Sequence, residues 1–114
     1  MTRDLTQLNK LEQYLKDHKI PYERFDNDDI PYSPTITYAF KKSERHQICV
    51  PGYSADNREW DAICQRGSYG AEEGLLEIYG SIVPENAGDS VEGWLTANDV
   101  IERIEKVYGE NETD

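Results

Sequence analysis

One histidine and two cysteines in the middle of the chain have side chains that can bind metal or perform nucleophilic chemistry. His46 and Cys49 stand three positions apart, and Cys64 follows in the same stretch. Imidazole and thiolate are the usual ligands of structural zinc. Residues three apart on a β-strand point to opposite faces of the sheet, so this His–Cys pair does not converge on one ion. We therefore expect no metal site and two buried, reduced cysteines.

The same residues suggest a catalytic Cys–His pair. If Val50 lies opposite Trp60 on antiparallel strands, the same register places His46 opposite Cys64. An imidazole beside a cysteine can activate its thiolate for nucleophilic attack. This register is an assumption at this point, and no residues for an oxyanion hole can be named.

A second catalytic alternative uses carboxylates. Asp61 precedes the glycine-rich Gly67–Gly70 turn, and Glu72 and Glu73 follow it. No familiar catalytic spacing accompanies these acids or the Cys–His pair. We therefore expect a protein that is not an enzyme and needs no cofactor, and we keep both catalytic sets as alternatives.

Two segments near the ends of the chain have the periodicity of amphipathic helices. Within residues 4–18, leucines recur every three or four positions, and Pro21 ends the pattern. The second helix follows Thr96, whose pairing with Asp99 has the form of a capping box, and Gly109 fits its end.

The region between the helices alternates between apolar and polar residues, as β-strands do. Strands are expected at 22–25, 35–40, 46–50, 60–64 and 90–94. Residues 71–79 are ambiguous. A short third helix is preferred there, although Leu76–Tyr79 alternates and suits a strand equally. The fold class predicted is α+β, with an antiparallel β-meander packed against an N-terminal and a C-terminal helix.

Length and charge bound the remaining possibilities. The 114 residues fit one domain, predicted at 1–109, followed by a short acidic tail at 110–114. With no secretion signal, bilayer-spanning apolar run or cysteine framework, the cytoplasm is the expected compartment. The formal net charge is -11, of which residues 67–114 contribute -10. That acidity argues against direct nucleic-acid binding, which depends on Lys and Arg.

The confinement of charge to one half suggests a surface for a basic protein partner, although an acidic surface also serves solubility. The Gly67–Gly70 turn lies where the near-neutral half meets the acidic half. The predicted partner-binding residues are Arg66, Ser68, Tyr69, Glu72, Glu73, Glu77, Glu85, Asp89 and Glu92.

Two segments carry a resemblance to a known group of proteins. One runs from Trp60 to Gly70 and continues through Gly74–Ile78, and the other is Gly93–Ala97 with Val100 and Ile101. They resemble small uncharacterised proteins carried by prophages and mobile elements of Gram-positive gut bacteria. The resemblance implies a phage–host conflict or accessory role and carries no catalytic residue.

We therefore expect a small acidic binding protein. The more specific hypothesis is a phage-encoded inhibitor or nucleic-acid mimic that binds a basic protein surface. Anti-defence proteins would belong to that class. An oligomerising structural protein, which uses exposed tyrosines and tryptophans as a dimer face, is a further alternative.

Overall fold

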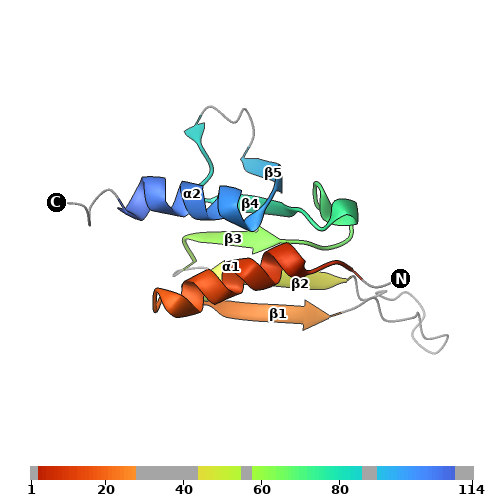
Figure 1. Cartoon of the computed structure of the whole chain (residues 1–114), viewed down its shortest axis with the longest axis horizontal. Coiled ribbons are helices and arrows are strands. Elements are labelled where there is room, and N and C mark those ends of the chain that lie inside the picture. Colours follow the sequence, from red (N-terminus) through yellow and green to blue (C-terminus); the bar gives the residue numbers. More distant parts are fainter. Residues whose placement is uncertain (1–2, 28–43, 55–57, 86–89, 110–114) are drawn as a thin grey trace.

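The computed structural model describes residues 3–27, 44–54, 58–85 and 90–109 (Figure 1). Five strands form one antiparallel sheet in the order β1-β2-β3-β4-β5. They are β1 (Glu23–Asn27), β2 (Arg45–Val50), β3 (Trp60–Ile63), β4 (Leu76–Gly80) and β5 (Val91–Leu95). Helices α1 (Thr6–Asp17) and α2 (Ala97–Tyr108) precede and follow the sheet. This confirms the predicted α+β meander; the strand predicted at 35–40 and the tail at 110–114 lie outside the described residues.

Both helices cover the same face of the sheet (Figure 1). The leucine stripe of α1 is buried at Leu8, Leu11 and Leu15, and these side chains belong to one core with Ile48 of β2 and Val100 of α2. Burial of such aliphatic side chains is the main favourable contribution to folding, at roughly 25 cal/mol per Å² of apolar surface removed from water. We call this the inner face of the sheet, and the opposite one the outer face.

The register of the strands places residues in rows across the sheet. Val50 pairs with Trp60, which confirms the register assumed from the sequence. One row of the outer face runs through Glu23, Cys49, Asp61 and Tyr79. Because side chains alternate along each strand, His46 and Cys49 lie on opposite faces, as expected.

The short helix preferred for 71–79 is limited to its first residues, and the strand alternative holds for the rest. A single turn of 3₁₀ helix, η1 (Ala71–Glu73), is followed directly by β4. Gly70 and Gly74 flank this turn with φ of 92° and 75°, a left-handed conformation that ends regular helix on both sides. Leu76 and Ile78 are buried and alternate with more exposed neighbours, which is the pattern of a strand with one face on the core.

Helix α2 begins as the sequence predicts. The Thr96 side chain accepts a hydrogen bond from the Asp99 N–H, and the Asp99 carboxylate accepts one from the Thr96 N–H. This capping box satisfies two backbone donors that the first turn of a helix otherwise leaves unpaired. In the described parts of the chain, no helix has both the length and the apolar character needed to cross a bilayer.

Candidate functional site

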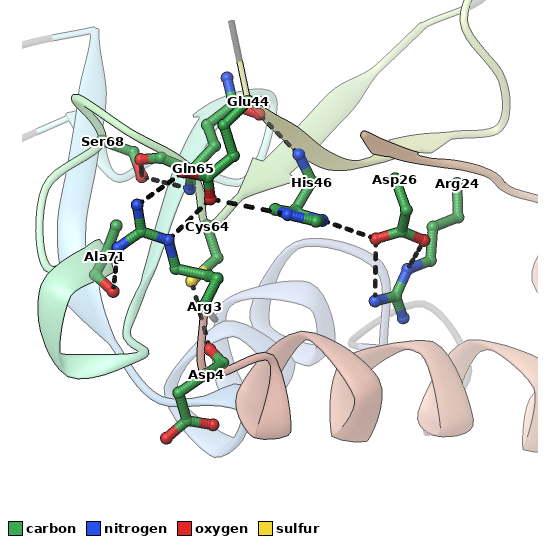
Figure 2. Close-up of polar contacts among 10 residues, drawn as sticks. All are labelled: Arg3, Asp4, Arg24, Asp26, Glu44, His46, Cys64, Gln65, Ser68 and Ala71. Carbon is green, nitrogen blue, oxygen red and sulfur yellow. Dashed lines mark hydrogen bonds and ion pairs between the residues drawn. The ribbon is translucent and has the colours of Figure 1, made fainter. Parts of the chain in front are cut away.

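His46 and Cys64 are neighbours in the sheet, but their side chains are engaged with other groups. The Cys64 N–H donates to the His46 carbonyl at 3.0 Å, so the backbones are paired as predicted. Figure 2 shows the imidazole between two carboxylates: Nδ1 lies 2.8 Å from Asp26 Oδ1 and Nε2 lies 3.6 Å from Glu44 Oε2. The Cys64 thiol instead donates to the Asp4 carbonyl at 3.7 Å.

The carboxylates around His46 belong to a larger polar network. Arg3 donates two hydrogen bonds of 2.7 Å to Glu44, and these hold the pKa of that carboxyl below its usual value. Burial alone would raise the pKa of Asp26, but hydrogen bonds from His46 and Arg24 outweigh burial and lower it. The network therefore connects the chain before α1 with the edge of the sheet, which is a structural use of His46.

The surroundings of both thiols disfavour the thiolate form. Burial raises the pKa of the Cys64 thiol and also that of Cys49, and both cysteines are free and buried. A nucleophilic cysteine needs the opposite shift, since the thiolate is the reactive form. Throughout the described ranges, no three His, Cys, Asp or Glu residues are grouped as metal ligands. The geometry thus does not favour the Cys–His alternative.

The three carboxylates of the second catalytic alternative are not brought together in one site. Asp61 lies on the outer face of β3, where Gln47 donates to its Oδ2 at 2.6 Å. Burial raises the pKa of this carboxyl. Glu72 and Glu73 are exposed on η1, and no hydrogen bond among described residues connects them with Asp61.

The turn after β3 combines structural residues with an exposed one. Ser68 is tied to Gln65, whose N–H donates to the Ser68 hydroxyl at 2.9 Å and whose carbonyl accepts from it at 2.7 Å. Tyr69 is 53% exposed, and its N–H donates to Glu77 at 2.9 Å. Ser68 and Glu77 therefore shape the turn, and Tyr69 is presented to solvent.

The predicted acidic residues fall into three groups. Glu72, Glu73 and Glu85 are exposed, as is the basic Arg66. Glu92 faces α2 and accepts two hydrogen bonds from Arg103 at 2.8 and 2.9 Å, so it serves the fold. Asp89 lies outside the described residues.

Trp94 was missed by the sequence prediction of a binding surface, and the structure brings it to the same place. It is 59% exposed and has a φ of 62°; Lys19 is the other non-glycine residue with positive φ in the described chain. Leu76 pairs with Leu95 and Ile78 with Glu92, so one residue of β4 faces two of β5, which is a β-bulge. Bulges re-aim side chains, and left-handed backbone is unfavourable for a bulky residue.

Trp94 and Tyr69 are joined through their backbones. The Trp94 N–H donates to the Tyr69 carbonyl at 3.3 Å, and a Cβ added to Gly93 would overlap the Tyr69 side chain. Glu72 and Glu73 follow Tyr69 within four residues. We call the group of Tyr69, Glu72, Glu73 and Trp94 the Tyr69–Trp94 surface. No sequence signal identifies it, because Tyr69 and Trp94 meet only through contacts between distant segments.

Comparisons of the chain with protein-family models, with curated proteins and with solved structures gave no match.

Proposed function

We propose that this protein is a non-enzymatic binding module that holds a basic protein surface through the Tyr69–Trp94 surface. The observation that carries the proposal is Trp94, an indole 59% exposed on a backbone with φ of 62°. Left-handed backbone destabilises an L-residue by about 1–2 kcal/mol. An external contact would explain why the fold keeps this conformation while more than half of the Trp94 surface stays exposed.

The chemistry of the surface suits a protein partner. Trp and Tyr are the residue types that most often dominate binding energy at protein interfaces, because they bury a large area with few rotatable bonds. Here both are anchored by backbone hydrogen bonds, so little conformational freedom is lost on binding. Glu72 and Glu73 are exposed three and four residues after Tyr69, and their negative charge favours Lys and Arg on the partner.

This arrangement favours an aromatic contact with an acidic rim over a continuous nucleic-acid mimic. A mimic needs many free carboxylates, but Glu77 is engaged with the Tyr69 N–H and Glu92 with Arg103. Within the same proposal, the resemblance to prophage-borne proteins makes a nucleic-acid-binding host protein the natural partner, and inhibition the natural outcome. Competition by DNA for the partner would then distinguish a mimic from an inhibitor that binds elsewhere.

A photo-crosslinking amino acid at position 94 tests the proposal in cells of the source organism. The matched control carries the crosslinker at Tyr79, which is 54% exposed and stands at the opposite end of the β4–β5 pair. We expect one prominent adduct from position 94, absent from position 79 and reduced by rising salt. The adduct protein, once purified, should bind the wild-type chain and lose affinity for Trp94→Ala.

Two results would contradict the proposal. Equal adduct patterns from positions 94 and 79 would show that Trp94 marks no preferred contact. An adduct between two copies of this chain, together with a dimer mass in solution, would replace the proposal with the oligomerising alternative.

A further inference from the structure

Two arginines on the outer face of the sheet are held by aromatic rings. The Arg45 guanidinium carbon lies 4.0 Å from the ring centroid of Phe25 and 5.0 Å from that of Tyr53. The Arg58 guanidinium carbon lies 5.4 Å from the same Tyr53 ring. Phe25 and Tyr53 meet edge to face at 5.5 Å. Two positive charges are thus gathered around one pair of rings.

This placement differs from that of other arginines in the fold. Arg3, Arg24 and Arg103 each form a salt bridge with a carboxylate. Arg45 and Arg58 form none with any residue of the described ranges. Their charges do act on Asp61, where they partly offset the rise that burial causes in the pKa of that carboxyl, but no carboxylate of the described residues lies within salt-bridge distance of either guanidinium.

Among the described residues, each of these two arginines donates one side-chain hydrogen bond. Arg45 donates from Nε to Gln47 at 2.9 Å, and Arg58 donates from Nη1 to the Cys49 sulfur at 3.9 Å. The other guanidinium N–H groups have no acceptor among the residues that the structure describes. Cation–π contact fixes the position of a guanidinium without using its N–H donors. Tyr53 is 52% exposed and Arg58 is exposed, so the face is accessible.

We propose that Arg45 and Arg58, together with Tyr53, form a binding site for a small phosphate monoester. Two guanidinium groups supply two positive charges and planar donor pairs, which match a phosphate of charge about -1.5 to -2 better than a single carboxylate. The acidic remainder of the chain repels an extended polyanion. Its field falls off within about 8 Å at physiological ionic strength, so a compact anion is much less affected.

Two carboxylates on the same face limit the affinity. Glu23 accepts a hydrogen bond from the Tyr53 N–H at 2.7 Å, and Asp61 accepts one from Gln47 at 2.6 Å. Both hold groups of the site in place, and both oppose an incoming anion. Asp61→Asn keeps a side-chain oxygen for Gln47 and removes the charge, so this variant should bind phosphate several-fold more tightly.

Titration of the full chain with methyl phosphate, followed in ¹H–¹⁵N spectra, tests the site. We expect saturable shifts at the Tyr53 amide and the Arg58 Nε–H. Arg58→Gln should weaken binding about tenfold, the usual effect of losing a charge-assisted hydrogen bond. Lys10→Gln is the matched control, because Lys10 is exposed on α1 and its loss changes the net charge equally.

Further ligands identify the preferred anion. Acetate should bind at least tenfold more weakly than methyl phosphate. A single-stranded oligonucleotide should bind no more tightly than methyl phosphate. Equal weakening by Arg58→Gln and Lys10→Gln, or equal affinities for acetate and methyl phosphate, would reduce the effect to net charge and overturn the site. Tighter binding of the oligonucleotide or of a phosphoserine peptide would overturn the assignment to a small monoester.

Discussion

The backbone N–H of Trp94 donates to the carbonyl oxygen of Tyr69 at 3.3 Å, and this contact joins the turn before η1 to edge strand β5. Gly93 makes the approach possible, because an added Cβ would overlap the Tyr69 side chain. Tyr69 and Trp94, both exposed, are therefore positioned by one another. Any change that separates the turn from β5 should alter both.

The first prediction concerns Gly93→Ala. We expect a loss of about 1–3 kcal/mol in the free energy of unfolding, the usual effect of overpacking a close contact. Urea denaturation measures the loss, and the Tyr69 amide resonance should shift with it. Gly109→Ala is the control, since a Cβ there makes ordinary contact at 3.4 Å, and this variant should be at least as stable as wild type.

Trp94 offers a second prediction, on strain. Glycine tolerates a φ of 62° and alanine does not, so Trp94→Gly should be more stable than Trp94→Ala by about 1 kcal/mol. Both variants should lose the proposed partner equally, because both lack the indole. Lys19, with φ of 56°, provides the control pair Lys19→Gly and Lys19→Ala, which should show the same stability difference with binding intact. Equal stability of the two Trp94 variants would mean that the backbone relaxes.

The helices and most strands could be predicted because their signals are local. The leucine stripe fixes the buried side of α1, and Thr96 with Asp99 fixes the start of α2. The pairing of Val50 with Trp60 was assumed from two alternating segments, and the structure confirms it. These features depend on residues that are close in sequence or on strict alternation.

The sites depend on contacts between distant segments and were predicted less well. Trp94 was expected as an ordinary strand residue, because nothing in 90–94 reveals that the Tyr69 turn would impose a bulge. Arg45 and Tyr53 come from separate segments and meet Phe25 only once β1 pairs with β2. The helix preferred at 71–79 is limited to its first residues for a related reason, since the left-handed Gly74 and the pairing of β4 outweighed local helix propensity.

A third prediction follows from the partly buried carboxyl of Asp61. Burial raises its pKa above the unfolded value, so the folded state disfavours the charged form. The charge therefore destabilises the protein at pH values above the folded pKa, and the penalty disappears as pH falls below the unfolded pKa of about 3.9. Asp61→Asn should raise the urea midpoint at neutral pH, and the advantage should shrink toward pH 4. A constant advantage would indicate a packing effect.

The capping box supplies a fourth prediction. Thr96→Ala removes the acceptor for the Asp99 N–H and should lower the free energy of unfolding by about 1 kcal/mol. Thr96→Ser retains the hydroxyl and should be close to wild type. Thermal or urea denaturation compares the three proteins. If Thr96→Ala left the midpoint unchanged, the first turn of α2 would not depend on this hydrogen bond.

The last prediction separates charge from the aromatic contact once the partner is known. Reversing Glu72 and Glu73 to Lys should slow association several-fold and reduce its salt dependence, because exposed charges steer diffusional encounter. Folding should change little, since exposed charges contribute little to stability. Tyr69→Ala should instead speed dissociation, as loss of an interface anchor does.

The matched control for this prediction reverses Asp17 and Glu102, which are exposed on α1 and α2 and change the net charge by the same amount. Stopped-flow or surface-based kinetics at two salt concentrations measures both rate constants. If the control slows association as much as the Glu72/Glu73 variant does, the acidity acts through net charge alone. Glu72 and Glu73 would then not steer the partner to this surface, and the acidic half would serve solubility. The role of the aromatic contact would be judged from the dissociation rate of Tyr69→Ala alone.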